Sequence, residues 1–267
     1  MADLRRSAVI LCVLLPALCG CGRAPAGPNV VLVVIDTFRA DHTSFTGYHR
    51  ETTPVLDSLA ECGASWTSFR SQSSWTLPAF ASIVTGLTPR EHMAGRRDGV
   101  FYGLDPDLPT IQKLFRIDGY RTAAFFNVVF LNEDFGFHIG FDHFDCSRFT
   151  GRTVLRRAGE TVDAFLGWLD GFDPSSGPFL AVVHFYDPHM PYDPPHPYSD
   201  LFTDPEYDGP CDSSWGSVPE LMAVNDGLDS IPADGLRNLE ALYDGELAYS
   251  DAELGRLLQG LRDRGLD

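Results

Sequence analysis

The sequence predicts an α/β fold in which a mostly parallel sheet is flanked by helices. Short apolar runs rich in β-branched residues alternate along the chain with longer segments of helical periodicity. The clearest run, Val30 to Ile35, is apolar at every position, as in a parallel strand that is buried on both faces. Asp36 follows this run directly, at the strand end where open α/β sheets place their ligands.

The first twenty residues have the features of an export signal. Arg5 and Arg6 precede an apolar stretch from Ala8 to Leu18 that is too short to span a bilayer comfortably. The sequence Leu-Cys-Gly-Cys that ends at Cys21 resembles the lipobox of bacterial lipoproteins, in which the last cysteine is lipidated. We therefore expect a lipoprotein signal peptide over residues 1–20 and lipidation of Cys21, which would anchor the protein in a membrane of the cell envelope. The alternative is a plain secretory signal that is cleaved nearby, and both interpretations export the protein.

A single domain over residues 29–267 is expected to follow a flexible tether. The tether, residues 21–28, is rich in Gly, Pro and Ala. Within the domain, further strands are expected over residues 122–126 and 179–184. Helices are expected from Thr53-Pro54 to a stop at Gly63, and over residues 109–115, 154–169 and 236–261. Residues 187–219 are rich in Pro, Asp, Ser and Gly, and they predict a loop region near the top of the sheet.

A second segment that could take part in catalysis lies at the start of another predicted helix. Thr76 comes just before Pro78, which can open a helix, and Gly86 provides the stop signal. The free N–H groups and the dipole at a helix N-terminus favour an anionic nucleophile or a bound oxyanion. A simple N-cap threonine needs the same position and no chemistry, so the local pattern leaves both interpretations open.

A third segment joins a buried strand to a proline-fixed loop. The strand at residues 179–184 runs directly into a loop that presents Asp187 and His189. A histidine in this place can donate to an ester oxygen or protonate a leaving group. A loop histidine that is hydrogen-bonded to backbone is the alternative interpretation.

Taken in order, these segments resemble the sulfatase family of the alkaline phosphatase superfamily, from Pro28 to the last residue. The similar blocks are PNVVLVVIDTFRADHTSFTGY, TPVLDSLAECGASWTSF, SWTLPAFASIVTGLTP, FLAVVHFYDPHMPYDPP and LYDGELAYSDAELGRLLQGL. The resemblance implies that Asp36 ligates a divalent cation and that Thr76 is both nucleophile and metal ligand. It also implies that His189 binds substrate near the leaving group.

The sequence departs from the sulfatase pattern in two places. Sulfatases carry C-x-P-x-R or S-x-P-x-R, whose first residue is oxidised to formylglycine, whereas this chain has Thr76-Leu77-Pro78-Ala79-Phe80. Many sulfatases also have a second aspartate where Thr37 stands. Phosphodiesterases and phosphoglycerol transferases of the same superfamily use an unmodified threonine as nucleophile. The substitution therefore shifts the expected chemistry from sulfate towards phosphate esters.

Two polar residues after Asp36 are candidates for further substrate contacts. Arg39 and His42 follow the predicted strand closely enough to reach a ligand. For Arg39, an ion pair with the neighbouring Asp41 is the preferred prediction, and neither residue is assigned to the site.

These observations predict a sulfatase-like, metal-dependent hydrolase of sulfate or phosphate esters. The expected cofactor is one divalent ion, Ca, Mn, Mg or Zn, and the expected partner is a sulfated or phosphorylated small molecule or glycan. The formal net charge of −17 argues against nucleic acid, because an acidic surface repels the phosphate backbone. The alternatives are a phosphoglycerol- or phosphoethanolamine-type transferase and a non-catalytic binding lipoprotein on an inactive sulfatase scaffold.

The resemblance also carries an expectation about the C-terminal end. Family members place a further strand after the helix that matches residues 236–261, and an Asp-His-Gly or Asp-Asn-Gly motif there supplies metal ligands. The given sequence ends at Asp267, where that strand would start. On this basis the C-terminal part of the domain is expected to be missing and the given chain to be inactive.

Overall fold

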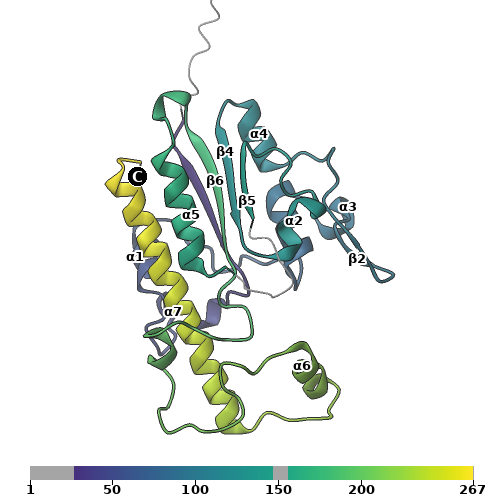
Figure 1. Cartoon of the computed structure of the whole chain (residues 1–267), viewed down its shortest axis with the longest axis vertical. Helices are drawn as coiled ribbons and strands as arrows, with labels where there is room; N and C mark the ends of the chain where they lie inside the picture. The colour runs from purple at the N-terminus through teal and green to yellow at the C-terminus, as the bar shows by residue number, and fades with distance from the viewer. Residues whose placement is uncertain (1–26, 147–155, 267) are drawn as a thin grey trace, which may run out of the picture.

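A four-stranded parallel sheet forms the centre of the protein in the computed structural model, which describes residues 27–146 and 156–266 (Figure 1). The strand order is β1-β6-β4-β5, and all three neighbouring pairs run parallel. The strands are β1 (Val30–Ile35), β4 (Arg121–Phe126), β5 (His143–Cys146) and β6 (Phe179–Phe185). The predicted signal peptide and Cys21 lie outside the described residues. The predicted fold class is confirmed.

Helices cover both faces of this sheet (Figure 1). One face packs against α1 (Pro54–Cys62), α5 (Ala158–Asp170) and α7 (Ala233–Asp263), and the other against α2 (Thr76–Thr85) and α4 (Ile111–Ile117). The short helix α3 (Pro89–His92) follows α2. The two faces explain why β1 and β6 are almost entirely apolar: neighbouring residues of one strand enter opposite hydrophobic cores.

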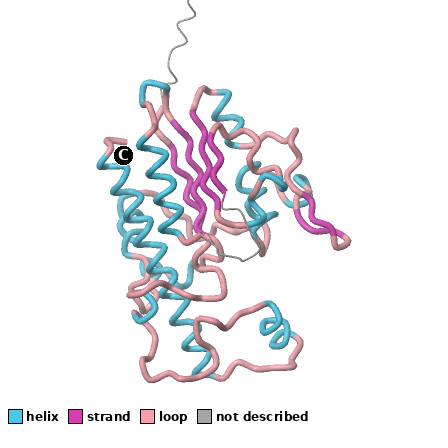
Figure 2. Tube along the Cα trace, viewed as in Figure 1, coloured by secondary structure: helices cyan, strands magenta, loops and turns pink. Residues whose placement is uncertain are grey.

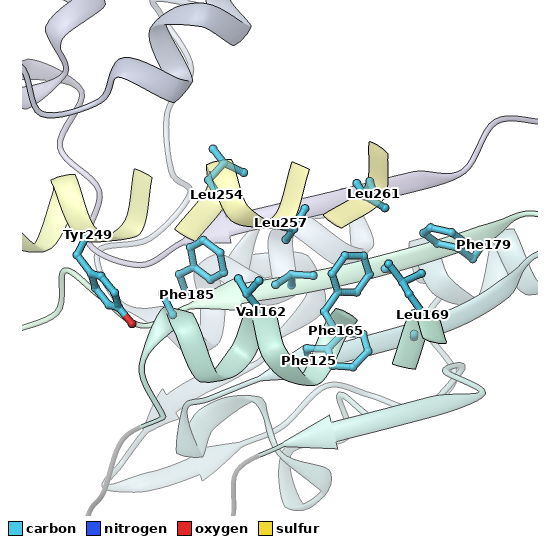
Figure 3. Close-up of a cluster of buried hydrophobic side chains, with 14 residues drawn as sticks. Phe125, Val162, Phe165, Leu169, Phe179, Phe185, Tyr249, Leu254, Leu257 and Leu261 are labelled. Atoms are coloured by element: carbon cyan, nitrogen blue, oxygen red, sulfur yellow. The ribbon is translucent and has the colours of Figure 1, made fainter. Parts of the chain in front are cut away.

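Strand β6 shows this division most clearly. All seven of its residues are buried. Ala181 and Val183 enter the core beneath α5 and α7, whereas Leu180 and Val182 enter the core beneath α2. Figure 3 shows the first core, where Phe165 of α5 and Leu257 of α7 meet the strands. Because β6 is central and apolar on both sides, it holds the site residues at its end in a fixed position.

Most predicted elements are confirmed, with small shifts of their ends. Strand β1 has the predicted bounds, and α2 begins at Thr76 as expected. Helix α7 is longer than predicted at both ends, and α5 begins at Ala158. The first residues of the range predicted for α5 lie outside the described residues.

Several small elements were not predicted. They include β5, α3, the antiparallel hairpin of β2 (Gly95–Arg97) with β3 (Val100–Tyr102), and α6 (Val218–Asn225). Figure 2 shows that loops dominate the chain between β6 and α7, in agreement with the loop region predicted there. No helix among the described residues has both the length and the apolar character needed to cross a membrane.

Candidate functional site

The candidate site lies where β1 and β6 end and α2 begins. Strands β1 and β6 are parallel neighbours in register from Val30 opposite Leu180 to Ile35 opposite Phe185. The pairing continues one residue further, where the Asp36 N–H donates to the Phe185 carbonyl over 2.9 Å. The side chain of Asp36 is therefore fixed at the carboxyl edge of the sheet, as its place after the strand predicted.

Thr76 contacts Asp36 directly. Its hydroxyl donates a hydrogen bond of 2.8 Å to Asp36 Oδ2. The N-cap of α2 is Trp75, whose backbone is extended, and Thr76 is the first helical residue. The interpretation of Thr76 as a simple N-cap is therefore wrong, because its hydroxyl is directed to Asp36 and its backbone is already helical.

A buried histidine that the sequence analysis missed completes this contact. His184 Nε2 of β6 lies 3.5 Å from Asp36 Oδ2. His184 Nδ1 lies 2.8 Å from Asn127 Oδ1, and Asn127 donates through Nδ2 to the Arg156 carbonyl over 2.8 Å. Because Nδ2 must donate to that carbonyl, Oδ1 faces the histidine, and the proton of this contact sits on His184 Nδ1. Nε2 faces Asp36, and it donates to the carboxylate when this second ring nitrogen also carries a proton.

Both missed residues carried a signal in the sequence. His184 is the one polar side chain in the run of residues 179–185, and Asn127 comes directly after the apolar end of the run at residues 122–126. Both side chains are buried, at 1% and 0% exposure. A polar residue at the end of a buried strand requires a partner, because an unpaired buried polar group costs about 1–3 kcal/mol.

The surroundings of Asp36 favour its charged form. Burial acts to raise the pKa of Asp36, but the hydrogen bond and charge of His184 and the hydrogen bond of Thr76 outweigh it. The charge of His189 acts in the same direction. The pKa of Asp36 is therefore held below its ordinary value, and the site contains a carboxylate.

His189 lies in the loop after β6, close enough for its charge to act on Asp36. Its ring stacks on Tyr186, with ring centroids 4.4 Å apart and planes inclined by 17°. His189 Nδ1 lies 2.7 Å from the Met190 carbonyl and 2.8 Å from the Tyr186 hydroxyl. A carbonyl only accepts, so Nδ1 carries the proton and Nε2 is the nitrogen left for a ligand. The backbone contact of the alternative interpretation is therefore present, and it orients the ring.

The loop after β1 is tied to α7 and to the loop of His189. The Tyr243 hydroxyl of α7 accepts from the Arg39 N–H over 2.8 Å and donates to the Thr37 carbonyl over 3.0 Å. Thr37 has a left-handed backbone, with φ of 48°, and its hydroxyl donates to the Pro188 carbonyl over 2.9 Å. The predicted ion pair of Arg39 with Asp41 is confirmed at 2.7 Å.

The motif position at Phe80 belongs to the core. Phe80 is 2% exposed and makes edge-to-face contacts with Phe126 and Phe137, at centroid distances of 5.2 and 5.5 Å. The arginine of the C-x-P-x-R motif is thus replaced by a core side chain.

Asp36, Thr76 and His184 line a cavity of about 1260 Å³. The loop before α2 contributes Trp66, Phe69 and Arg70 to its wall. The cavity has room for a substrate considerably larger than one sulfate or phosphate group.

The described residues offer only part of a metal site. Asp36 and Thr76 provide two oxygen donors of the kind that hard divalent cations prefer, whereas such cations take six or more oxygen ligands. The Thr37 hydroxyl is occupied by Pro188. Across residues 27–146 and 156–266, no group of three or more His, Cys, Asp or Glu side chains could hold a metal ion. In this part of the chain, the donors are too few to hold a metal on their own.

The family model described as Sulfatase matches residues 28–267. The chain belongs to the sulfatase family. Among curated proteins, this sulfatase-family chain is 25% identical to an arylsulfatase of Clostridium perfringens over 294 residues, which cover 89% of the chain and 60% of the relative. It is 24% identical to an ulvan-active sulfatase of Formosa agariphila, over 91% of the chain and 48% of that relative. The chain thus spans about half to three fifths of the length of these relatives.

Solved structures show the same fold. The phosphonate monoester hydrolase of Agrobacterium radiobacter matches with a TM-score of 0.70 at 22% identity, over 90% of this chain and 60% of that one. The C-terminal periplasmic domain of EcEptC from Escherichia coli, in complex with Zn, matches with a TM-score of 0.60 at 20% identity, over 91% and 61%. At these identities, the match establishes the sulfatase-like arrangement of sheet and helices.

Proposed function

We propose that this protein is a metal-dependent hydrolase of sulfate or phosphate esters, with Thr76 as its nucleophile. The observation that carries the proposal is the hydrogen bond of Thr76 to the carboxylate of Asp36 at the N-terminus of α2. Membership of the sulfatase family supports the class of reaction. Similarity to an arylsulfatase and to a phosphonate monoester hydrolase is in agreement with both ester types.

In the proposed reaction, Thr76 Oγ1 attacks the sulfur or phosphorus atom of the ester. The Thr76 hydroxyl loses its proton to water as a bond forms from Oγ1 to that atom, and the bond to the leaving oxygen breaks, which leaves the ester group on Thr76. His189 donates a proton through Nε2 to the departing oxygen. Water then attacks the same atom, releases sulfate or phosphate, and restores the Thr76 hydroxyl.

Asp36 orients the nucleophile but is a weak base. Because its pKa is held below the ordinary value, Asp36 takes little of the threonine proton at neutral pH. The exposed N–H groups at the start of α2 favour negative charge on the attacking oxygen or on the ester. A divalent cation with Asp36 and Thr76 among its ligands would supply the further lowering of the hydroxyl pKa that this chemistry needs.

The alternatives make different predictions. A transferase would pass the group from Thr76 to an acceptor alcohol instead of water, and a binding lipoprotein would not form the ester. Phe80 and Thr37 favour the binding alternative, because each replaces a charged family residue with one that is engaged elsewhere in the structure.

The proposal is tested with aryl sulfates, phosphate monoesters and phosphodiesters, each with Ca, Mn, Mg or Zn and after chelation. In the full-length protein, we expect turnover of at least one ester, loss of turnover on chelation, and a covalent ester on Thr76 in quenched reactions. Product that appears only with an added alcohol would assign a transferase. No turnover with any pair of metal and ester, together with tight binding of the esters, would assign the binding function.

We also propose that the protein is exported and held in the cell envelope by lipid on Cys21. The support is the charge of Arg5 and Arg6, the apolar stretch up to Leu18, and the lipobox-like sequence. A sulfated or phosphorylated glycan or small molecule outside the cytoplasm is the substrate that this location suggests.

A further inference from the structure

Two carboxyl groups are buried together beneath the loop that carries His189. Asp187, at the start of the loop, is 8% exposed, and Glu246 of α7 is 3% exposed. Their side chains lie within hydrogen-bonding reach of each other. Neither residue has a role in the reaction proposed above. Two ionised carboxylates at this distance and depth would repel strongly, so one of them must hold a proton.

Glu246 contacts the loop that follows β6. Its Oε1 accepts from the N–H of Asp193, six residues after Asp187, over 2.9 Å. Its Oε2 is buried, and no N–H or O–H group of the described residues donates to it. Asp187 Oδ2 accepts from the Ala158 N–H over 2.8 Å. A proton on Glu246 Oε2 satisfies both residues, because Glu246 then donates to the Asp187 carboxylate.

The surroundings of the pair agree with this placement of the proton. Burial, followed by the charge of Asp187, raises the pKa of Glu246 to about 8. Among residues 27–146 and 156–266, the cation whose charge acts on the pair is Arg157, which donates to the Asp193 carbonyl and carboxylate over 2.7 and 2.8 Å. The other titratable groups that face the pair are tyrosines from the end of β6, the loop and α7, namely Tyr186, Tyr192 and Tyr249. These tyrosines are neutral at pH 8, because burial raises the pKa of each.

We propose that Glu246 is a positioning residue that fixes the loop of His189 through a proton shared with Asp187. The proton links Asp187 to α7, and Oε1 links Asp193 to the same helix. Loss of the proton leaves two adjacent buried charges, which moves the loop and with it the ring of His189. The part of the inference that concerns His189 as a proton donor rests on the proposed function, whereas the shared proton of Asp187 and Glu246 does not.

The sign of the pH effect follows from the direction of the shift. The pKa of Glu246 is higher in the folded protein than in the unfolded chain, so its proton stabilises the folded state fully below about pH 4. This contribution is lost as the pH rises through about 8, the pKa of the folded protein. Glu246→Gln keeps a neutral donor in the same place, and its Oε1 can still accept from Asp193. The variant should therefore lose this part of the pH dependence.

The experiment compares urea unfolding of the wild type, Glu246→Gln and Glu240→Gln from pH 5 to pH 9. Glu240, also on α7, has a half-exposed side chain and serves as the matched control. We expect the urea midpoint of the wild type and of Glu240→Gln to fall between pH 5 and about pH 8, where the folded protein keeps a proton that the unfolded chain has lost, and that of Glu246→Gln to fall much less. At pH 9, Glu246→Gln should be the most stable of the three. Parallel pH curves for all three proteins would overturn the shared proton.

A second measurement reports on the loop and needs no turnover. The imidazole resonances of His189, assigned with His189→Gln, should shift or broaden above pH 8 in the wild type and stay unchanged in Glu246→Gln. If the resonances of His189 behave identically in both proteins, Glu246 does not position the loop. If the ester assays fail but the resonances shift as expected, the proposed reaction is wrong and the shared proton of Asp187 and Glu246 still stands.

Discussion

Thr76 donates a hydrogen bond of 2.8 Å to Asp36, although the two residues lie 40 positions apart in the chain. The contact forms because β1 ends and α2 begins at the same edge of the sheet. Among the hydroxyl groups of the chain, the contact marks that of Thr76, because it holds this hydroxyl against the carboxylate of Asp36. The first prediction therefore concerns this hydroxyl.

In an active full-length form, Thr76→Ala should reduce turnover by about 10³-fold or more, because it removes the attacking oxygen. Thr76→Ser should keep part of the activity, since it retains the hydroxyl and loses only the methyl group that restrains it. The matched control is Thr85→Ala at the other end of α2, where the hydroxyl donates to the Ala81 carbonyl of its own helix. Ester hydrolysis by each variant, with folding checked by circular dichroism, makes the comparison. A Thr76→Ala protein with most of its activity would exclude Thr76 as the nucleophile.

Tyr243→Phe should destabilise the protein by about 1–3 kcal/mol, because it leaves the Arg39 N–H and the Thr37 carbonyl without their partner. Turnover should fall as well, since this hydroxyl fixes the residues that follow Asp36. Tyr102→Phe, on the exposed hairpin, should change the free energy of unfolding by less than about 0.5 kcal/mol. Urea unfolding measures both effects. Equal stability of the two variants would show that the Tyr243 hydroxyl does not hold this loop.

Gly245→Ala should destabilise the protein by about 1–3 kcal/mol through overpacking. A Cβ atom at this position of α7 would lie 2.5 Å from the backbone oxygen of Tyr198, which cannot move as a side chain could. Gly167→Ala is the control, because its Cβ would meet nothing within 4 Å on the exposed side of α5. There alanine should stabilise the helix by about 0.5–1 kcal/mol. A stabilising effect at both positions would contradict the close approach of α7 to residue 198.

Cys21→Ala should abolish the incorporation of labelled fatty acid, whereas Cys19→Ala, two residues earlier, should leave it intact. A multiply acylated cysteine holds a protein at a membrane because each buried CH₂ group contributes about 0.8 kcal/mol. Mass spectrometry of the mature N-terminus provides an independent reading. An unmodified N-terminus beyond Cys21 would favour the plain secretory signal.

The elements that the sequence predicted best are those with a long, uninterrupted pattern. The run from Val30 to Ile35 has one interpretation, because six apolar residues followed by Asp36 fit a buried parallel strand. Strand β5 was missed since its four residues, His143–Cys146, include two polar side chains and follow an aromatic-rich segment without a clear period. Its pairing with β4 is a tertiary contact that a local pattern does not encode.

The candidate site was predictable in part for the same reason. Asp36 and Thr76 are marked by the elements that they end or begin, and each signal lies within a few residues. The link of Asn127 to His184 joins two strand ends that are 57 positions apart, so it depends on the order of strands in the sheet. The pairing of Asp187 with Glu246 joins a loop to a helix and depends on packing in the same way.

The place of β1 in the sheet also sets the order in which the protein can be assembled. Strand β1 is the first to leave the ribosome, yet its described partner is β6, and the Phe179 N–H reaches Asn29 across 150 positions. At about 5–20 residues per second, translation takes on the order of ten seconds to supply that partner. Throughout this interval, Val30–Ile35 is an apolar segment without its native neighbour, and such segments are prone to aggregate. The strand that positions Asp36 is therefore a part of the nascent chain that needs chaperone protection during translation.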